Sequence, residues 1–66
     1  MFKILYQNQI YGNFYQILVG TDDDEFVCVF TATESKRIFD MTTLDEYNLK
    51  LHQKLIDFMV ENGFSL

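Results

Sequence analysis

The sequence predicts an α+β fold, in which a small antiparallel β-meander of three to four strands carries one C-terminal α-helix packed on one face. Two observations lead to this prediction. Short runs rich in aromatic and β-branched residues, separated by turn residues, occupy positions 2–41. The last third of the chain instead carries apolar residues at helical spacing. Because no linker, repeat or low-complexity run interrupts the chain, we expect residues 1–66 to form a single small α+β domain.

The first two predicted strands cover residues 2–7 and 14–19, where aromatic and aliphatic side chains dominate. Asn8-Gln9 and Gly12-Asn13 are the turn signals between these two runs. We therefore expect the two strands to be neighbours in the meander.

A polar loop at residues 20–25 separates the second strand from a third at residues 26–31. Strand-like runs joined in this way form an antiparallel hairpin, although the loop is longer than the tightest type. Residues 34–37 are polar and indicate a further turn before a short fourth strand at residues 38–41. A single helical turn fits residues 38–41 nearly as well, so the pattern leaves both interpretations open.

The apolar spacing predicts a helix over residues 44–62. Thr43 and Glu46 have the spacing of a capping box, in which each side chain bonds the backbone amide of the other residue. Gly63 suits the left-handed position that ends a helix, and Phe64 is expected to fold back on Met59. One face of the helix forms a main apolar stripe, made of Leu44, Tyr47, Leu51, Leu55, Phe58 and Met59.

A second apolar patch lies away from this stripe and consists of Leu49, Ile56 and Val60. A lone helix on a sheet needs only one apolar stripe. The second patch either rests against the edge of a curved sheet or the N-terminal segment, or it is a contact surface for another molecule.

The predicted strands are apolar on both faces, unlike those of a half-solvated antiparallel sheet, which alternate apolar and polar residues. In the third strand Phe26, Cys28 and Phe30 are expected to point one way and Val27 and Val29 the other. One helix covers one face, so we expect a second copy of the chain or another protein on the face it leaves open. A 66-residue domain has a marginal core, and one cysteine and one histidine provide neither an internal disulfide nor a structural zinc site.

Ten acidic and five basic residues give a net charge of −5. The only adjacent basic pair is Lys36-Arg37, so nucleic-acid binding and binding to an anionic membrane are both disfavoured. The first ten residues lack the apolar run of a signal peptide, and no stretch is long enough to span a bilayer. We therefore expect a cytoplasmic protein.

Cys28 and His52 are the candidates for chemistry. A mid-strand cysteine among apolar neighbours usually behaves as a small buried hydrophobe with a raised pKa. A nucleophilic thiol would need a base within hydrogen-bond reach, and His52 is the only histidine. His52 is more simply a residue at the boundary between the two apolar stripes, with one ring edge in water.

The acidic run of residues 22–25 invites a calcium interpretation, because hard cations prefer carboxylate oxygens. The spacing of an EF-hand loop fails here, since its later ligand positions fall on Phe26 and Cys28. We interpret the run as a solvated hairpin tip that keeps an apolar strand soluble. It is also a possible electrostatic contact for a basic partner.

The sequence favours a non-catalytic protein-binding module: a small acidic regulator or inhibitor that docks on a larger protein, or a homodimer, or both. Small acidic accessory proteins of bacteriophages offer an analogy in size and charge only. We expect no cofactor and no metal. The alternative is a small enzyme or ligand-binding subunit that uses Cys28 and His52. The expected contacts are the sheet face that the helix leaves open or the side chains of Leu49, Ile56, Val60, Asp22, Asp23 and Asp24.

Overall fold

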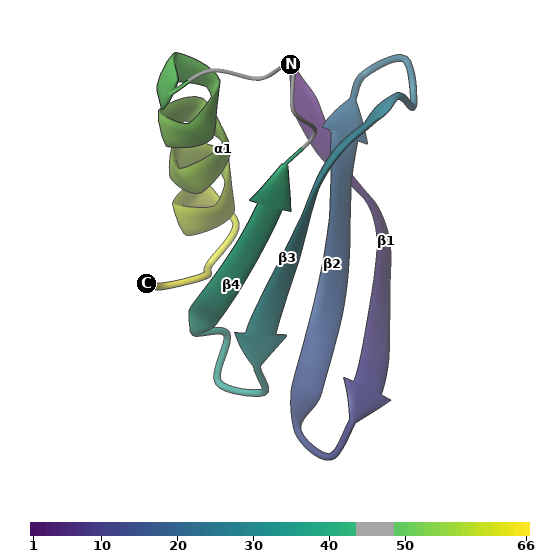
Figure 1. Cartoon of the computed structure of the whole chain (residues 1–66), viewed down its shortest axis with the longest axis vertical. Coiled ribbons are helices and arrows are strands. Elements are labelled where there is room, and N and C mark those ends of the chain that lie inside the picture. The colour runs from purple at the N-terminus through teal and green to yellow at the C-terminus, as the bar shows by residue number, and fades with distance from the viewer. Residues whose placement is uncertain (44–48) are drawn as a thin grey trace.

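The strands follow one another across a single antiparallel sheet in the order of the sequence, and one helix lies against one face of that sheet (Figure 1). The computed structural model describes residues 1–43 and 49–66. Within them the elements are β1 (Phe2–Tyr11), β2 (Phe14–Thr21), β3 (Phe26–Thr33), β4 (Ile38–Thr43) and α1 (Leu49–Glu61). The predicted α+β meander with a C-terminal helix is confirmed.

Strand β1 is longer than predicted, because it continues through Asn8 and Gln9 to Tyr11. Those polar residues do not form a turn. They are tolerated because β1 is an edge strand and its second half is exposed to water. The turn to β2 is made by Gly12 and Asn13 alone, with φ +57° at Gly12. A positive φ at the first of two loop residues is the pattern of a type II′ hairpin turn.

The other two hairpins share one design, in which the amide of a threonine donates to the carbonyl of the residue four positions later and encloses three loop residues. In the first, the amide of Asp24 donates to the carbonyl of Thr21 at 3.0 Å and the amide of Thr21 donates to the carbonyl of Glu25 at 2.9 Å. Lys36 stands in the second loop where Asp24 stands in the first, and φ is 67° at Asp24 and 66° at Lys36. A turn that ends in a left-handed residue is a common closure of three-residue hairpins. Strand β4 follows the second loop, so of the two interpretations left open for residues 38–41 the strand is the one observed.

The hydrophobic core lies between α1 and the face of the sheet that it covers. Ile17 on β2 is paired with Phe30 on β3, and Val19 is paired with Cys28; all four side chains are fully buried. Residues paired across an antiparallel sheet point to the same face. From the helix and the segment after it, the core receives Leu55, Met59 and Phe64. The described part of the main apolar stripe is therefore the buried face of α1, as predicted.

A bulge at Val27 changes the facing of β3. Val19 is paired with Cys28, but the next residue, Gly20, is paired with Phe26, so β3 carries one extra residue there. An extra residue reverses the alternation of side chains on one side of it. Phe26 therefore lies on the sheet face away from α1. The prediction that Phe26, Cys28 and Phe30 share one face is wrong for Phe26, because the alternation assumed an unbroken strand. The companion prediction that Val27 and Val29 share the other face is wrong for Val27, which is buried in the core.

The C-terminal end of α1 closes as predicted. Gly63 has φ +92°, its amide donates to the carbonyl of Val60 at 3.1 Å, and the amide of Phe64 donates to the carbonyl of Met59 at 3.1 Å. These two bonds define a Schellman motif, in which the residue after the glycine packs back on the helix. The chain then joins the β4 edge, since Ser65 exchanges backbone hydrogen bonds of 2.7 and 2.8 Å with Ile38 and Lys36.

The predicted start of the helix falls mainly outside the described residues. Leu44, Glu46 and Tyr47 lie there, and the helix as described begins at Leu49. Thr43, the expected cap, is the last residue of β4, and its hydroxyl lies 2.8 Å from Nε2 of His52. In the described part of the chain, no helix is long and apolar enough to cross a lipid bilayer.

Candidate protein-interaction surface

We call the sheet face away from α1 the open face. The pairing register shows which residues lie on this face. One row across it runs from Tyr6 to Leu18, then to Val29 and then to Thr42. Leu18 and Val29 are only half-buried, although they lie on the two central strands of the sheet. Helix α1 packs on the other face with Ile17, Val19 and Phe30, so it does not cover this row.

One end of the open face, the apolar end, consists of Leu5, Tyr6, Leu18, Phe26 and Val29. Leu5 sits at a register shift in β1 and lies directly over Gly20 on β2. A Cβ atom at Gly20 would come within 2.5 Å of Cδ1 of Leu5, so the glycine makes room for the leucine side chain. Tyr6 is 57% exposed and Phe26 is 39% exposed. These large side chains therefore present apolar area to solvent from fixed strand positions.

The other end of the open face, the aromatic end, consists of Tyr11, Phe14 and Phe39. The rings of Phe14 and Phe39 meet edge to face, with centroids 5.3 Å apart and planes at 64°. Tyr11 is paired with Phe14 next to the β1–β2 turn. Phe39 sits at a register shift in β4 and is 56% exposed, while Tyr11 is 74% exposed. Edge-to-face pairs contribute about 0.5–1.5 kcal/mol beyond their buried area, so the Phe14–Phe39 contact stabilises this end of the sheet.

A polar row crosses the sheet between these two ends. Asn8 is paired with Gln16, Gln16 with Thr31, and Thr31 with Asp40. The open face is therefore two apolar areas separated by hydrogen-bonding side chains, and the expectation of strands apolar on both faces holds only at its ends. Threonine and glutamine on a strand suit contact with water, which explains how the sheet leaves this face uncovered.

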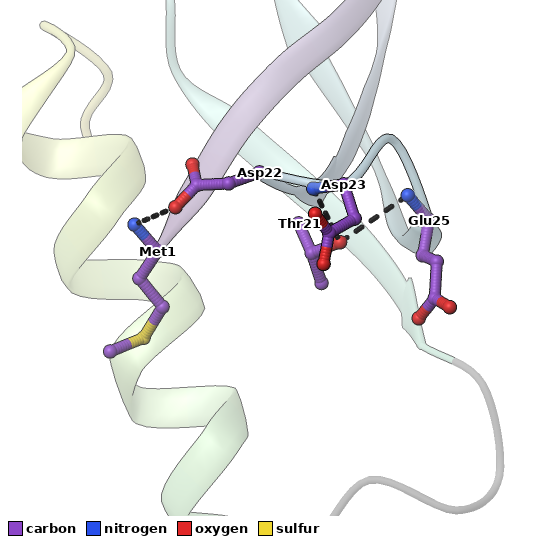
Figure 2. A network of polar contacts seen from close by, with 5 residues as sticks. All are labelled: Met1, Thr21, Asp22, Asp23 and Glu25. Carbon is purple, nitrogen blue, oxygen red and sulfur yellow. Dashed lines mark hydrogen bonds and ion pairs between the residues drawn. The ribbon is translucent and has the colours of Figure 1, made fainter.

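The acidic loop of residues 22–25 borders the apolar end, because Glu25 directly precedes Phe26. Asp22 Oδ2 lies 2.8 Å from the N-terminal amine of Met1, and Asp24 Oδ1 lies 2.6 Å from Nζ of Lys3. Figure 2 shows that Asp23 and Glu25 instead bond through their backbone, since both amides donate to Oγ1 of Thr21 at 3.3 Å.

Two aspartates of the acidic loop thus have cationic partners at the start of β1. The carboxylates of Asp23 and Glu25 have no ion-pair partner among the described residues. Among those same residues, no group of three or more histidine, cysteine, aspartate or glutamate side chains could hold a metal ion.

The helix residues predicted as contacts lie on the opposite side of the sheet from the open face. Val60 is 51% exposed and Ile56 is half-buried. The side chain of Leu49 lies outside the described part of the structure. The acidic loop and the open face are adjacent, whereas the helix patch is a separate surface.

Cys28 is buried in the core, and the ring of His52 contacts Thr43. Burial raises the pKa of the Cys28 thiol from 9.0 to about 12, and a hydrogen bond with the backbone of Thr42 offsets only part of that rise. The thiol is completely shielded from solvent and therefore protonated at neutral pH. Cys28 is paired with Thr43, and it is Thr43 whose hydroxyl contacts the half-buried His52. The structure assigns Cys28 to the core.

The aromatic side chains of the open face are the residues that sequence reasoning did not single out as contacts. The sequence indicated one uncovered face because a single helix covers only one face of strands that are apolar on both. The facing of Phe26 and Phe39 depends on the register shifts in β3 and β4, which alternation does not reveal. No protein-family model, curated protein or solved structure matches this chain.

Proposed function

We propose that the chain is a non-catalytic protein-binding module whose contact surface is the open face. The observation that carries this proposal is the set of large apolar side chains that stay exposed there, namely Tyr6, Tyr11, Phe14, Phe26 and Phe39. Exposed aromatic residues gathered on one face are typical of interaction sites, and tyrosine and tryptophan are enriched among the residues that dominate binding energy.

The strand positions of these aromatic residues favour binding. Side chains on a paired sheet have little backbone freedom left to lose, so ordering them in a complex costs little entropy. Fully burying a phenylalanine side chain contributes about 1.5–3 kcal/mol, and several are available on one face. Gln16 and Thr31 between the two ends supply the polar contacts that give an interface its register.

The net charge of −5 supports a role as a small acidic regulator or inhibitor that docks on a larger protein. The shielded, protonated thiol of Cys28 argues against an activity that depends on this cysteine as nucleophile. A lone reduced cysteine fits the cytoplasm, which we keep as part of the proposal.

The test compares three forms of the chain as baits in an extract of the native host. Phe39→Asp places a charge on the aromatic end, and Val60→Asp places the same charge on the helix patch at a residue of similar exposure. Both residues are more than half exposed, so both variants should retain the wild-type circular dichroism spectrum and unfold cooperatively. Each bait also needs a sedimentation measurement, because a second copy of the chain is one possible partner.

A protein identified by mass spectrometry should co-purify with the wild type and with Val60→Asp but not with Phe39→Asp. The same pattern in sedimentation, a dimer lost only in Phe39→Asp, would support the open face with a second copy as occupant. Loss of the captured protein in Val60→Asp alone would move the contact to the helix patch and refute the proposal. A bait that stays monomeric and captures nothing specific would refute the binding function itself.

A further inference from the structure

We infer that the occupant of the open face is a different protein, one that presents Lys or Arg side chains beside an apolar ridge, rather than a second copy of this chain. This inference rests on the proposed binding function. It follows from the order of the three zones along the open face, which are the apolar end beside the acidic loop, the polar row and the aromatic end.

Two copies that meet through the same face are related by a two-fold axis that lies between the two sheets. Its two limiting directions are along the strands and across them. These two arrangements bring different zones into contact.

With the axis along the strands, each of the three zones faces the same zone of the other copy. The apolar ends then pack together, but so do the two acidic loops, because this loop joins the two central strands β2 and β3. Each copy contributes four acidic residues at positions 22–25, of which Asp22 and Asp24 have cationic partners on β1. Like charges placed opposite each other at an interface are strongly unfavourable, so the repulsion between the two acidic loops disfavours this dimer.

With the axis across the strands and through the polar row, the acidic loops move to opposite ends and the apolar end of each copy faces the aromatic end of the other. The polar row then faces its own copy. Asp40 lies in this row, so the two Asp40 carboxylates would face each other across the axis. Like charges placed opposite each other at an interface are unfavourable.

A different protein avoids the unfavourable contacts of both dimer arrangements. It can present apolar side chains to the apolar end while its cations face Asp23 and Glu25, whose carboxylates have no ion-pair partner among the described residues. Opposite charge at the border of an apolar contact speeds encounter and sets orientation. The acidic loop and the apolar end adjoin at Glu25 and Phe26, so one basic segment can engage both.

The test uses a random linear-peptide library displayed on phage, selected against the immobilised wild-type chain. Enriched peptides should combine aromatic or aliphatic residues with Lys or Arg, and high salt should weaken their binding. Asp23→Asn with Glu25→Gln keeps the shape of the loop but removes two charges, and it should weaken the selected peptides by about tenfold. Asp57→Asn with Glu61→Gln removes two exposed charges from α1 instead and should leave binding unchanged.

Peptides that bind the open face without an excess of basic residues, or with no salt dependence, would overturn the inference and leave the binding function standing. Peptides that still bind the Phe39→Asp and Phe26→Asp variants would count against both the inference and the proposed binding function. A dimer at micromolar concentration that Phe39→Asp dissociates would identify a second copy as the occupant and overturn the inference. Failure to enrich any peptide from the library would also count against it.

Discussion

The hydroxyl of Thr43 lies 2.8 Å from Nε2 of His52, and this contact joins the last residue of β4 to α1. Thr43 is also paired with Cys28 on β3, which belongs to the hydrophobic core. A single side chain therefore links the sheet, the core and the helix. The capping-box interpretation assigned the same hydroxyl to the backbone of residue 46, which lies outside the described residues.

The first prediction concerns this hydrogen bond. Thr43→Val removes the hydroxyl but keeps the branched shape, so it should lower the free energy of unfolding by about 1 kcal/mol. Thr42→Val is the matched control, because Thr42 is the exposed neighbour on the other face and should change stability by less than about 0.5 kcal/mol. Urea denaturation of both variants measures the two values.

A double-mutant cycle separates the His52 contact from a helix cap. If the hydroxyl of Thr43 bonds His52, Thr43→Val should lower the free energy of unfolding much less in a His52→Ala background than in the wild type. Equal costs in the two backgrounds would show that the hydroxyl stabilises the chain through a different partner, such as the backbone at the helix start.

The second prediction concerns the pH dependence that Cys28 imposes on stability. The folded chain holds the thiol proton up to about pH 12, whereas the unfolded chain releases it near 9.0. Between these pH values the folded state binds more protons than the unfolded state, so the contribution of Cys28 is complete below pH 9 and is lost as the pH rises towards 12.

Comparison with Cys28→Ala isolates this effect from the titration of tyrosine and lysine. The stability difference between wild type and variant should be constant below pH 9 and should then shrink with a slope of up to about 1.4 kcal/mol per pH unit. A thiol reagent should label the wild type only as fast as the chain unfolds. Rapid labelling of the folded chain near neutral pH would show that the thiol is accessible.

The third prediction concerns the close contact at Gly20. A Cβ atom there would meet the carbonyl oxygen of Glu25 and Cδ1 of Leu5, each at 2.5 Å. Gly20→Ala should therefore cost about 2–3 kcal/mol, because a backbone atom has to move. Gly12→Asn is the comparison variant: its site is open, so its effect on the free energy of unfolding, about 1 kcal/mol, comes from the backbone conformation at φ +57° and not from a clash. Thermal melts would contradict the Leu5–Gly20 contact if both variants matched the wild type.

The fourth prediction concerns the acidic loop. Replacing Asp22, Asp23 and Asp24 with Asn breaks two ion pairs that are largely exposed to solvent. Exposed pairs contribute about 0–1 kcal/mol each, so the triple variant should unfold close to the wild-type denaturant concentration. A calcium-dependent rise in the wild-type melting temperature, absent in the triple variant, would instead establish a metal site in this loop.

The sequence predicted the order of elements because each had a local signal. The helix end followed from Gly63 and Phe64, and the turns followed from clustered polar residues and glycine. The facing of Phe26 and Phe39 could not be predicted, since one extra residue in a strand reverses the alternation and leaves no mark in the composition. The hydroxyl contact of Thr43 was missed for a related reason, because the capping spacing is local whereas His52 approaches only in the folded chain.

The proposed contact surface is the open face and not the helix patch. Hydroxyl-radical footprinting of the chain, alone and in the complex purified from its host, tests this most directly, because it reads the solvent exposure of each aromatic side chain. We predict protection of Tyr6, Phe26 and Phe39 in the complex, with Val60 oxidised as fast as in the free chain. Protection of Val60 with unchanged oxidation of the three open-face residues would contradict the claim.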